Sequence, residues 1–139
     1  MPINILLVED DDVAAEAVKR NLKKLSIEYP IIHANDGQEA LDILLNQHPQ
    51  KSISKPFLIL LDLNMPRMNG FEFLNAIRTD DKLKDSVVFV LTTSDDDKDR
   101  SRAYHECIAG YMVKSGVGPQ FAKLAGLLES YKLAVKLPK

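Results

Sequence analysis

The chain has 139 residues, a length that suits one domain with a single hydrophobic core. Hydrophobic residues make up 45%, charged residues 27%, and the formal net charge is −2, so charge gives no reason to expect nucleic acid or an anionic membrane as a partner. Cys107 is the only cysteine, which excludes an intrachain disulfide, and the absence of a signal-peptide pattern or an apolar run near ~18 residues favours the cytoplasm.

The first part of the chain alternates short apolar runs with segments of helical periodicity. Residues 3–8 are apolar and end in a run of acidic residues, which predicts a strand that stops where charge begins. Apolar residues recur at helical spacing from Val13 to Leu25, and we expect Asp12 to cap that helix. The next predicted elements are a strand at 30–34, a turn at 35–37, a helix at 39–46 and a polar loop at 48–56.

The central stretch is an unbroken apolar run, residues 57–61, that leads straight into Asp62. Such a run predicts a strand buried on both faces, as in a parallel sheet. Asp62 then lies at the carboxyl end of the strand, the edge at which ligands bind in open α/β sheets. The remaining predicted elements are helices at 70–79, 95–105 and about 119–134, and strands at 87–91 and 110–113.

Strand and helix therefore alternate five times along the sequence. This alternation predicts an α/β domain with a single five-stranded parallel sheet and helices on both faces. Five right-handed units in ~120 residues favour the flavodoxin-like strand order 2-1-3-4-5, which places the first strand beside the third.

Residues with acidic, hydroxyl or amino side chains follow four of the five predicted strands. Glu9 and Asp10 follow the first strand, Asp62 the third, Thr92 the fourth and Lys114 the fifth. Taken singly, these residues have plainer interpretations as a solvated loop, a strand end, a helix-start hydroxyl and a surface lysine. Together they predict clustered carboxylates that need a cation, and hard oxygen ligands suit Mg²⁺. A carboxylate in such a site, flanked by a hydroxyl and an ammonium, can act as a nucleophile toward phosphorus.

Other reactive side chains give weaker indications. His33, His48 and His105 show no metal-ligand spacing, and we expect them at the surface or half-buried. Cys107 is interpreted as a small core residue. The sequence contains neither a Gly-x-Gly-x-x-Gly motif after a strand nor a Walker-type loop, which disfavours nucleotide binding.

Four short motifs resemble those of the receiver domain of two-component response regulators, the CheY-like family. They are Val8-Glu9-Asp10, Leu61-Asp62-Leu63-Asn64-Met65-Pro66 with Gly70, Leu91-Thr92, and Tyr111-Met112-Val113-Lys114, with a family-typical gap of 22 residues from Thr92 to Lys114. The resemblance covers nearly the whole chain. It implies that Asp62 accepts a phosphoryl group from the phosphohistidine of a histidine kinase. It further implies that Asp10, Asp62 and the backbone carbonyl of Asn64 ligate Mg²⁺, that Glu9 acts through water, and that Thr92 and Tyr111 form a switch pair.

The sequence departs from the family after Lys114, where Ser115 stands in place of the usual proline. Because a cis bond to a residue other than proline costs ~3–4 kcal/mol, the sequence leaves the geometry of this bond open. The segments Thr92-Thr93-Ser94, Lys114-Ser115 and 135–138 resemble the single-domain regulators that partner bacterial and cyanobacterial phytochrome kinases. This narrower resemblance implies a phytochrome-type histidine kinase as partner, and a downstream phosphotransfer protein as a further one.

Two other functions compete with a stand-alone signalling switch. A Mg²⁺-dependent phosphatase of the haloacid-dehalogenase type also uses a strand-end aspartate, but it needs a second Asp where Asn64 stands, and it needs a cap insertion. A pseudo-receiver is disfavoured because every expected acidic, Thr and Lys position is filled. We expect a signalling switch rather than a dedicated enzyme. The surface formed by 95–105, 110–113 and 119–134 is expected to change on phosphorylation and to pass the signal on.

The end of the chain carries an apolar stripe beyond the one needed for docking a helix on the sheet. We predict one receiver domain over 1–139 with a helical tail extension from about 130. Leu127, Tyr131 and Ala134 lie at 3- and 4-residue spacing and form this second stripe. An exposed apolar patch marks an interaction site, so the sequence predicts a homodimer, with a tail folded back on its own domain as the alternative.

Overall fold

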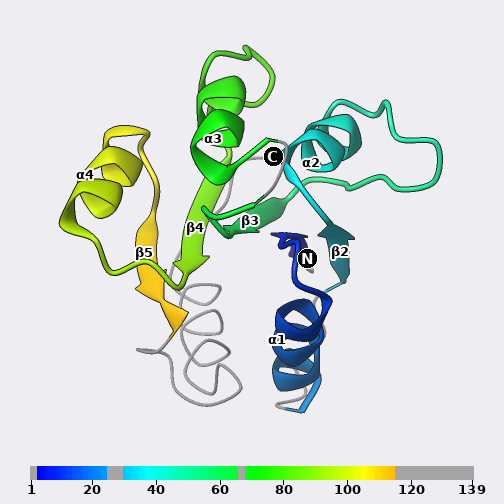
Figure 1. Cartoon of the computed structure of the whole chain (residues 1–139). Helices are drawn as coiled ribbons and strands as arrows, with labels where there is room; N and C mark the ends of the chain where they lie inside the picture. Colours follow the sequence, from blue (N-terminus) through cyan, green and yellow to red (C-terminus); the bar gives the residue numbers. More distant parts are fainter. Residues whose placement is uncertain (1–2, 25–29, 66–67, 115–139) are drawn as a thin grey trace.

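The computed structural model describes residues 3–24, 30–65 and 68–114, which form a five-stranded parallel sheet with helices against both faces (Figure 1). Along the sheet the strands run in the order β2-β1-β3-β4-β5, which confirms the predicted order. The elements are β1 (Asn4–Val8), α1 (Asp12–Lys24), β2 (Ile31–Ala34), α2 (Gly37–Leu44), β3 (Phe57–Leu61), α3 (Gly70–Arg78), β4 (Val87–Thr92), α4 (Asp97–His105) and β5 (Gly110–Val113).

The pairing of β1 with β3 determines which side chains meet at the carboxyl edge of the sheet. Val8 pairs with Leu61, the last residues of the two strands, so Glu9 and Asp62 leave the sheet side by side. The Asp62 amide donates to the Val8 carbonyl at 3.0 Å and extends the pairing by one residue. The strand order alone therefore brings together residues that are more than fifty positions apart.

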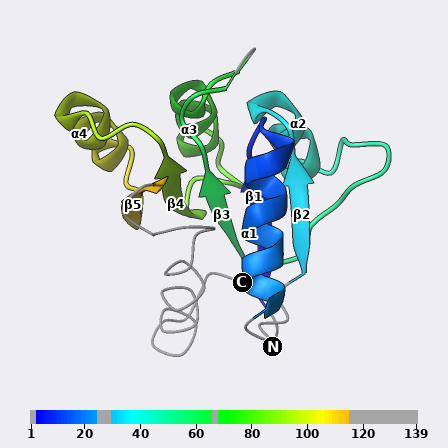
Figure 2. The ribbon, with the colours of Figure 1, turned by 60° about the horizontal axis from the view of Figure 1, so that its bottom comes forward.

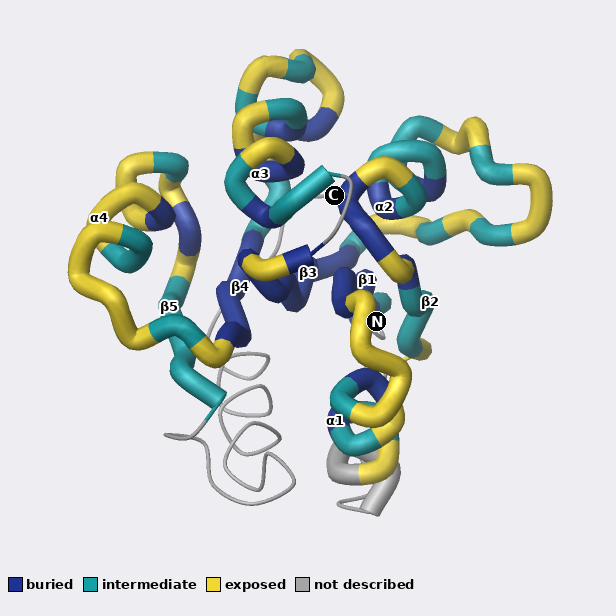
Figure 3. Tube along the Cα trace, in the orientation of Figure 1, coloured by how far each residue is buried: buried dark blue, intermediate teal, exposed yellow. Residues whose placement is uncertain are grey.

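Alternating side chains of the strands build two hydrophobic layers, one on each side of the sheet. Leu6, Ile59 and Val88 pack with residues of α2 and α3 on one face. Ile5 and Leu60 pack on the other face with residues of α1, which lies across the sheet in Figure 2. All residues of β3 are buried, as Figure 3 shows, and this explains the unbroken apolar run in the sequence.

Three helix starts differ from the prediction. The helix predicted from 95 is α4, which begins at Asp97 after the N-cap Asp96. The carboxylate of Asp11, rather than Asp12, accepts from the Val13 amide at 2.9 Å, so α1 begins one residue earlier. Helix α2 begins at Gly37, inside the predicted turn at 35–37. Its N-cap is Asp36, which has an extended backbone and a carboxylate that accepts from the Glu39 amide at 2.8 Å. In all three cases several Asp or Asn residues lie next to each other, and the sequence does not distinguish which one accepts the free amides.

A partly buried arginine ties three segments at the amino-terminal edge of the sheet. Arg78, the last residue of α3, donates from Nε to the Glu106 carbonyl at 2.7 Å and from Nη2 to the Cys107 carbonyl at 3.1 Å. Its Nη1 donates to the carbonyls of Lys84 and Ser86 at 2.9 and 2.8 Å. The guanidinium therefore links α3 to the segments that precede β4 and β5, a role that the fixed fork of five donors allows.

The interpretation of Cys107 as a core residue is wrong. Its side chain is exposed, and its backbone is left-handed with φ of 61°. The residue directly follows the C-cap of α4, Glu106, and its amide donates to the Tyr104 carbonyl at 2.9 Å. A left-handed residue after a helix satisfies the free carbonyls of the last turn, and glycine is the residue that adopts it without strain.

Replacing Cys107 by glycine is therefore expected to stabilise the protein by about 1 kcal/mol, because the left-handed backbone costs an L-residue more than it costs glycine. Urea unfolding followed by circular dichroism measures this change. Cys107→Ala is the matched control, since it removes the thiol but keeps the strain and should leave stability near the wild-type value. Equal stabilities of the Gly and Ala variants would contradict the prediction.

Several sequence predictions concern residues outside the described ranges. The final helix at about 119–134, the tail from about 130, and the dimer stripe Leu127, Tyr131 and Ala134 lie there, as does the Lys114–Ser115 bond. Among the described residues, no helix has the length and apolar character needed to cross a membrane.

Candidate functional site

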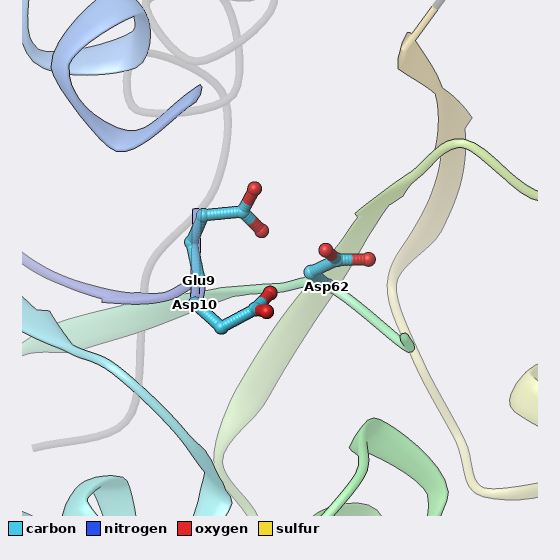
Figure 4. Close-up of side chains that lie close together, drawn as sticks. All are labelled: Glu9, Asp10 and Asp62. Atoms are coloured by element: carbon cyan, nitrogen blue, oxygen red, sulfur yellow. The ribbon is translucent and has the colours of Figure 1, made fainter. Parts of the chain in front are cut away.

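Three carboxylates meet at the carboxyl edge of the sheet, where β1 and β3 end. Glu9, Asp10 and Asp62 each offer one carboxylate oxygen, and these three atoms lie within 4.8 Å of one another. Figure 4 shows the three side chains gathered at this edge. Glu9 and Asp62 are buried, with 3% and 7% of their surface exposed, whereas Asp10 is exposed to solvent. The structure thus brings together the three acidic residues that the sequence places at these strand ends.

Lys114 directly follows β5 and reaches across the sheet edge to the two buried carboxylates. Its Nζ lies 2.8 Å from Glu9 Oε1 and 3.6 Å from Asp62 Oδ2. Only 17% of the lysine side chain is exposed, so solvent screens these interactions weakly. One ammonium facing three carboxylates leaves the cluster with excess negative charge.

The electrostatics of this cluster are visible in two pKa values. Burial is the main reason that the pKa of Glu9 is raised to about 8, and a hydrogen bond with Asp62 acts in the same direction, against the opposing effect of Lys114. Burial disfavours the charge on Lys114, but its hydrogen bond to Glu9 and the charge of Asp62 outweigh burial and raise the pKa of Lys114. Without a further cation, the cluster therefore favours a proton on Glu9 at neutral pH.

This shift predicts how the stability of the metal-free protein depends on pH. Between the ordinary pKa of Glu, about 4.3, and the folded value of about 8, the folded state binds a proton that the unfolded state has lost. The contribution of Glu9 to the free energy of unfolding is therefore fully present at low pH and is lost as pH rises through that window. Unfolding in EDTA from pH 5 to 8 should show this decrease, and Glu9→Gln should flatten it. Parallel pH profiles for the two proteins would refute the assignment.

The residues present fit a divalent cation. All three acidic side chains offer hard oxygen ligands, and a doubly charged ion would neutralise the excess negative charge that Lys114 leaves.

The backbone of the surrounding loops is also fixed. The Asn64 amide donates to Asp62 Oδ1 at 3.2 Å, and the ring Nε2 of His33 donates to the Glu9 carbonyl at 2.7 Å. His33 was expected only as a scattered histidine, and the sequence gives no sign of this contact.

Gly70 allows the loop after Asp62 to pack closely against the sheet. Its amide donates to the Leu63 carbonyl at 3.0 Å. A Cβ at this position would lie 2.6 Å from Leu63 Cα and 2.8 Å from the Asp62 carbonyl oxygen, which are backbone atoms that cannot move aside easily. Asn69 caps α3 in a reciprocal capping box with Glu72. Close packing and the cap together explain why an Asn-Gly pair begins this helix.

Thr92 is the last residue of β4, and Tyr111 lies within the neighbouring strand β5. Thr92 is fully buried, and its Oγ1 accepts from the Ser94 amide at 3.4 Å. The Tyr111 hydroxyl donates to the Ser94 carbonyl at 2.9 Å, and burial raises its pKa. The two residues predicted as a switch pair are therefore joined through one residue, Ser94, which the sequence prediction did not include in the site.

Comparison with known protein families gives one match that spans most of the chain. The model of the response regulator receiver domain matches residues 5–124. That range includes every described residue of the site, from Glu9 to Lys114.

Two individual relatives match most of the chain. The response regulator Rcp1 of Synechocystis sp. is 36% identical over 138 residues, which are 99% of this chain and 94% of Rcp1. The probable methanogenesis regulatory protein FilR2 of Methanothrix harundinacea is 38% identical over 113 residues, 81% of this chain and 72% of FilR2.

Two solved structures share the fold over nearly their whole length. The phosphorylated cyanobacterial phytochrome response regulator RcpA superposes with a TM-score of 0.87 at 31% identity and covers 100% of both chains. The Mn²⁺-bound form of Rcp1 superposes with a TM-score of 0.86 at 36% identity and covers 99% of this chain and 100% of Rcp1.

Proposed function

We propose that this chain, which belongs to the response regulator receiver domain family, is a signalling switch that accepts a phosphoryl group on Asp62. The observation that carries the proposal is the placement of Asp62. Its buried carboxylate directly follows the central strand β3, with oxygens of Glu9 and Asp10 within 4.8 Å and Lys114 Nζ 3.6 Å away. The family match supports the signalling interpretation of the sequence over the phosphatase one.

The side chains of the chain suit an in-line transfer from phosphohistidine. An oxygen of Asp62 would attack phosphorus, a P–O bond would form, and the P–N bond to the imidazole of the donor would break. Lys114 would stabilise negative charge that develops on the phosphoryl oxygens, and the hydroxyl of Thr92 would donate to one of them. The same groups would stabilise the charge that develops when water later attacks the acyl phosphate and releases inorganic phosphate from Asp62.

The proposed resident ion is Mg²⁺, held by the carboxylates of Asp10 and Asp62 and the backbone carbonyl of Asn64, with Glu9 acting through water. When bound, it would neutralise the carboxylates and compensate charge on the transferred group. Among the described residues the cluster consists of three carboxylates and includes no His or Cys, which supports a hard cation over a transition metal that prefers imidazole or thiolate. Rcp1 has been observed with Mn²⁺, a cation that accepts the same kind of ligands.

A histidine kinase is the proposed phosphoryl donor, and the likeness to RcpA supports a phytochrome-type kinase. The test is to mix the protein with a panel of autophosphorylated kinases, phytochrome-type kinases included, and to follow loss of phosphohistidine and gain of acyl phosphate over seconds to minutes. Rapid transfer from a phytochrome-type kinase supports the pairing. Transfer from other kinases but not from that type would reject the pairing while supporting the receiver function.

We also propose a homodimer formed by the second apolar stripe of the tail, Leu127, Tyr131 and Ala134. Only the sequence pattern supports this proposal, because these residues lie outside the described ranges. Light scattering at several concentrations should give a dimer mass for the full chain and a monomer mass for a chain that ends at Ser130. A full-length protein that stays monomeric at ~100 µM, with and without a phosphoryl mimic, would exclude this interface.

A further inference from the structure

Ser94 uses all of its polar groups to join three different elements. Its amide donates to Thr92 Oγ1 at the end of β4, and its carbonyl accepts from the Tyr111 hydroxyl on β5 at 2.9 Å. Its own hydroxyl donates to Asp99 Oδ2, in the first turn of α4, at 2.7 Å. Ser94 is therefore the residue at which β4, β5 and α4 meet.

These bonds differ in strength. The bond from the Ser94 amide to Thr92 is long at 3.4 Å, and the one from the Asp96 amide to Ser94 Oγ is 3.3 Å. The bond to Asp99 is short, and a carboxylate acceptor makes such a bond roughly twice as strong as a neutral one. Asp99 is therefore the group that holds the Ser94 side chain most firmly.

Helix α4 has little apolar packing that could fix its position instead. Ala103 is the one buried residue among its nine. A further contact of α4 is a cation–π one, with the guanidinium of Arg102 4.0 Å from the ring centre of Phe71 on α3. A helix that buries one small side chain depends on such polar contacts for its placement.

We infer that Asp99 is a positioning residue, which through the Ser94 hydroxyl fixes the segment that places the Thr92 hydroxyl and holds the Tyr111 hydroxyl. The inference rests on the proposed function, since Thr92 and Tyr111 matter through the phosphoryl group on Asp62. If Thr92 turns toward that group, the Ser94 amide loses its acceptor. The short bond to Asp99 then transmits the movement of Ser94 to α4, and the bond to Tyr111 transmits it to β5.

The test follows the Tyr111 ring by fluorine NMR in full-length protein that contains 3-fluorotyrosine. The chain has four tyrosines, and Tyr111→Phe identifies the resonance of interest. Asp99→Ala and Ser94→Ala should each move this resonance toward the position of solvent-exposed fluorotyrosine, and the double variant should move it no further. Asp99→Asn keeps an acceptor for the Ser94 hydroxyl and should restore most of the wild-type position.

Asp97→Ala is the matched control, because Asp97 carries the same charge in the same first turn but is exposed and pairs with Arg100 rather than Ser94. It should leave the Tyr111 resonance in place. An unmoved resonance in Asp99→Ala, an equal shift in Asp97→Ala, or additive shifts in the double variant would overturn the inference. Labelling of wild-type Asp62 by acetyl phosphate is measured separately, so that failure of the proposed function is distinguished from failure of this contact.

Discussion

An Asp62→Asn variant is expected to take up no phosphoryl group from acetyl phosphate or from a histidine kinase, a change from near-stoichiometric labelling to background. The amide that replaces the carboxylate is neutral and a much weaker nucleophile. Intact-mass spectrometry at neutral pH, before the acyl phosphate hydrolyses, measures the incorporation.

The fold should survive this substitution, which makes the result interpretable. Asn has the shape of Asp, its side-chain oxygen can still accept from the Asn64 amide, and Lys114 keeps its partner Glu9 at 2.8 Å. Asp85→Asn is the matched control, because Asp85 is an exposed carboxylate that precedes β4 at the opposite edge of the sheet. Wild-type labelling of Asp62→Asn, or loss of labelling in Asp85→Asn, would refute Asp62 as the acceptor.

The sequence predicts the sheet and the cluster well because both depend on pattern and topology. The apolar run before Asp62 indicates a strand buried on both faces, and the structure shows all of β3 buried. Once the strand order is known, Glu9 and Asp62 must meet, since the residues before them pair in neighbouring strands. No knowledge of side-chain conformation is needed for that conclusion.

The features that the sequence does not predict depend on three-dimensional side-chain contacts. Cys107 is an apolar residue type that pattern reasoning assigns to the core, yet it serves as the left-handed residue that ends α4. The contact of His33 with the Glu9 carbonyl spans 24 positions, and the junction at Ser94 joins residues of β4, α4 and β5. Serine and histidine are common at surfaces, so residue type alone does not mark these contacts.

Replacing Asp10 by asparagine is expected to have opposite effects on the metal-free and metal-bound protein. Without metal, the carboxylate of Asp10 lies within 4.8 Å of the negative charge of Asp62, so its removal relieves repulsion and should raise stability, by less than about 1 kcal/mol because Asp10 is exposed. With Mg²⁺, the same substitution removes a charged ligand and should lower affinity at least tenfold, which corresponds to about 1.4 kcal/mol.

Thermal melts in EDTA and at increasing Mg²⁺ concentration measure both effects in one experiment, because a ligand that binds only the folded state stabilises it by RT ln(1 + [L]/Kd) and so raises the melting temperature more when it binds more tightly. We expect the Asp10→Asn melt to start above the wild type in EDTA and to rise less with Mg²⁺, so that the two titration curves cross. Asp11→Asn is the matched control, since Asp11 is the neighbouring exposed carboxylate and caps α1 instead of joining the cluster. It should lower neither the Mg²⁺ affinity nor the size of the metal-induced shift. If Asp10→Asn keeps the full Mg²⁺-induced shift, the ion is held without Asp10 and the proposed ligand set is wrong.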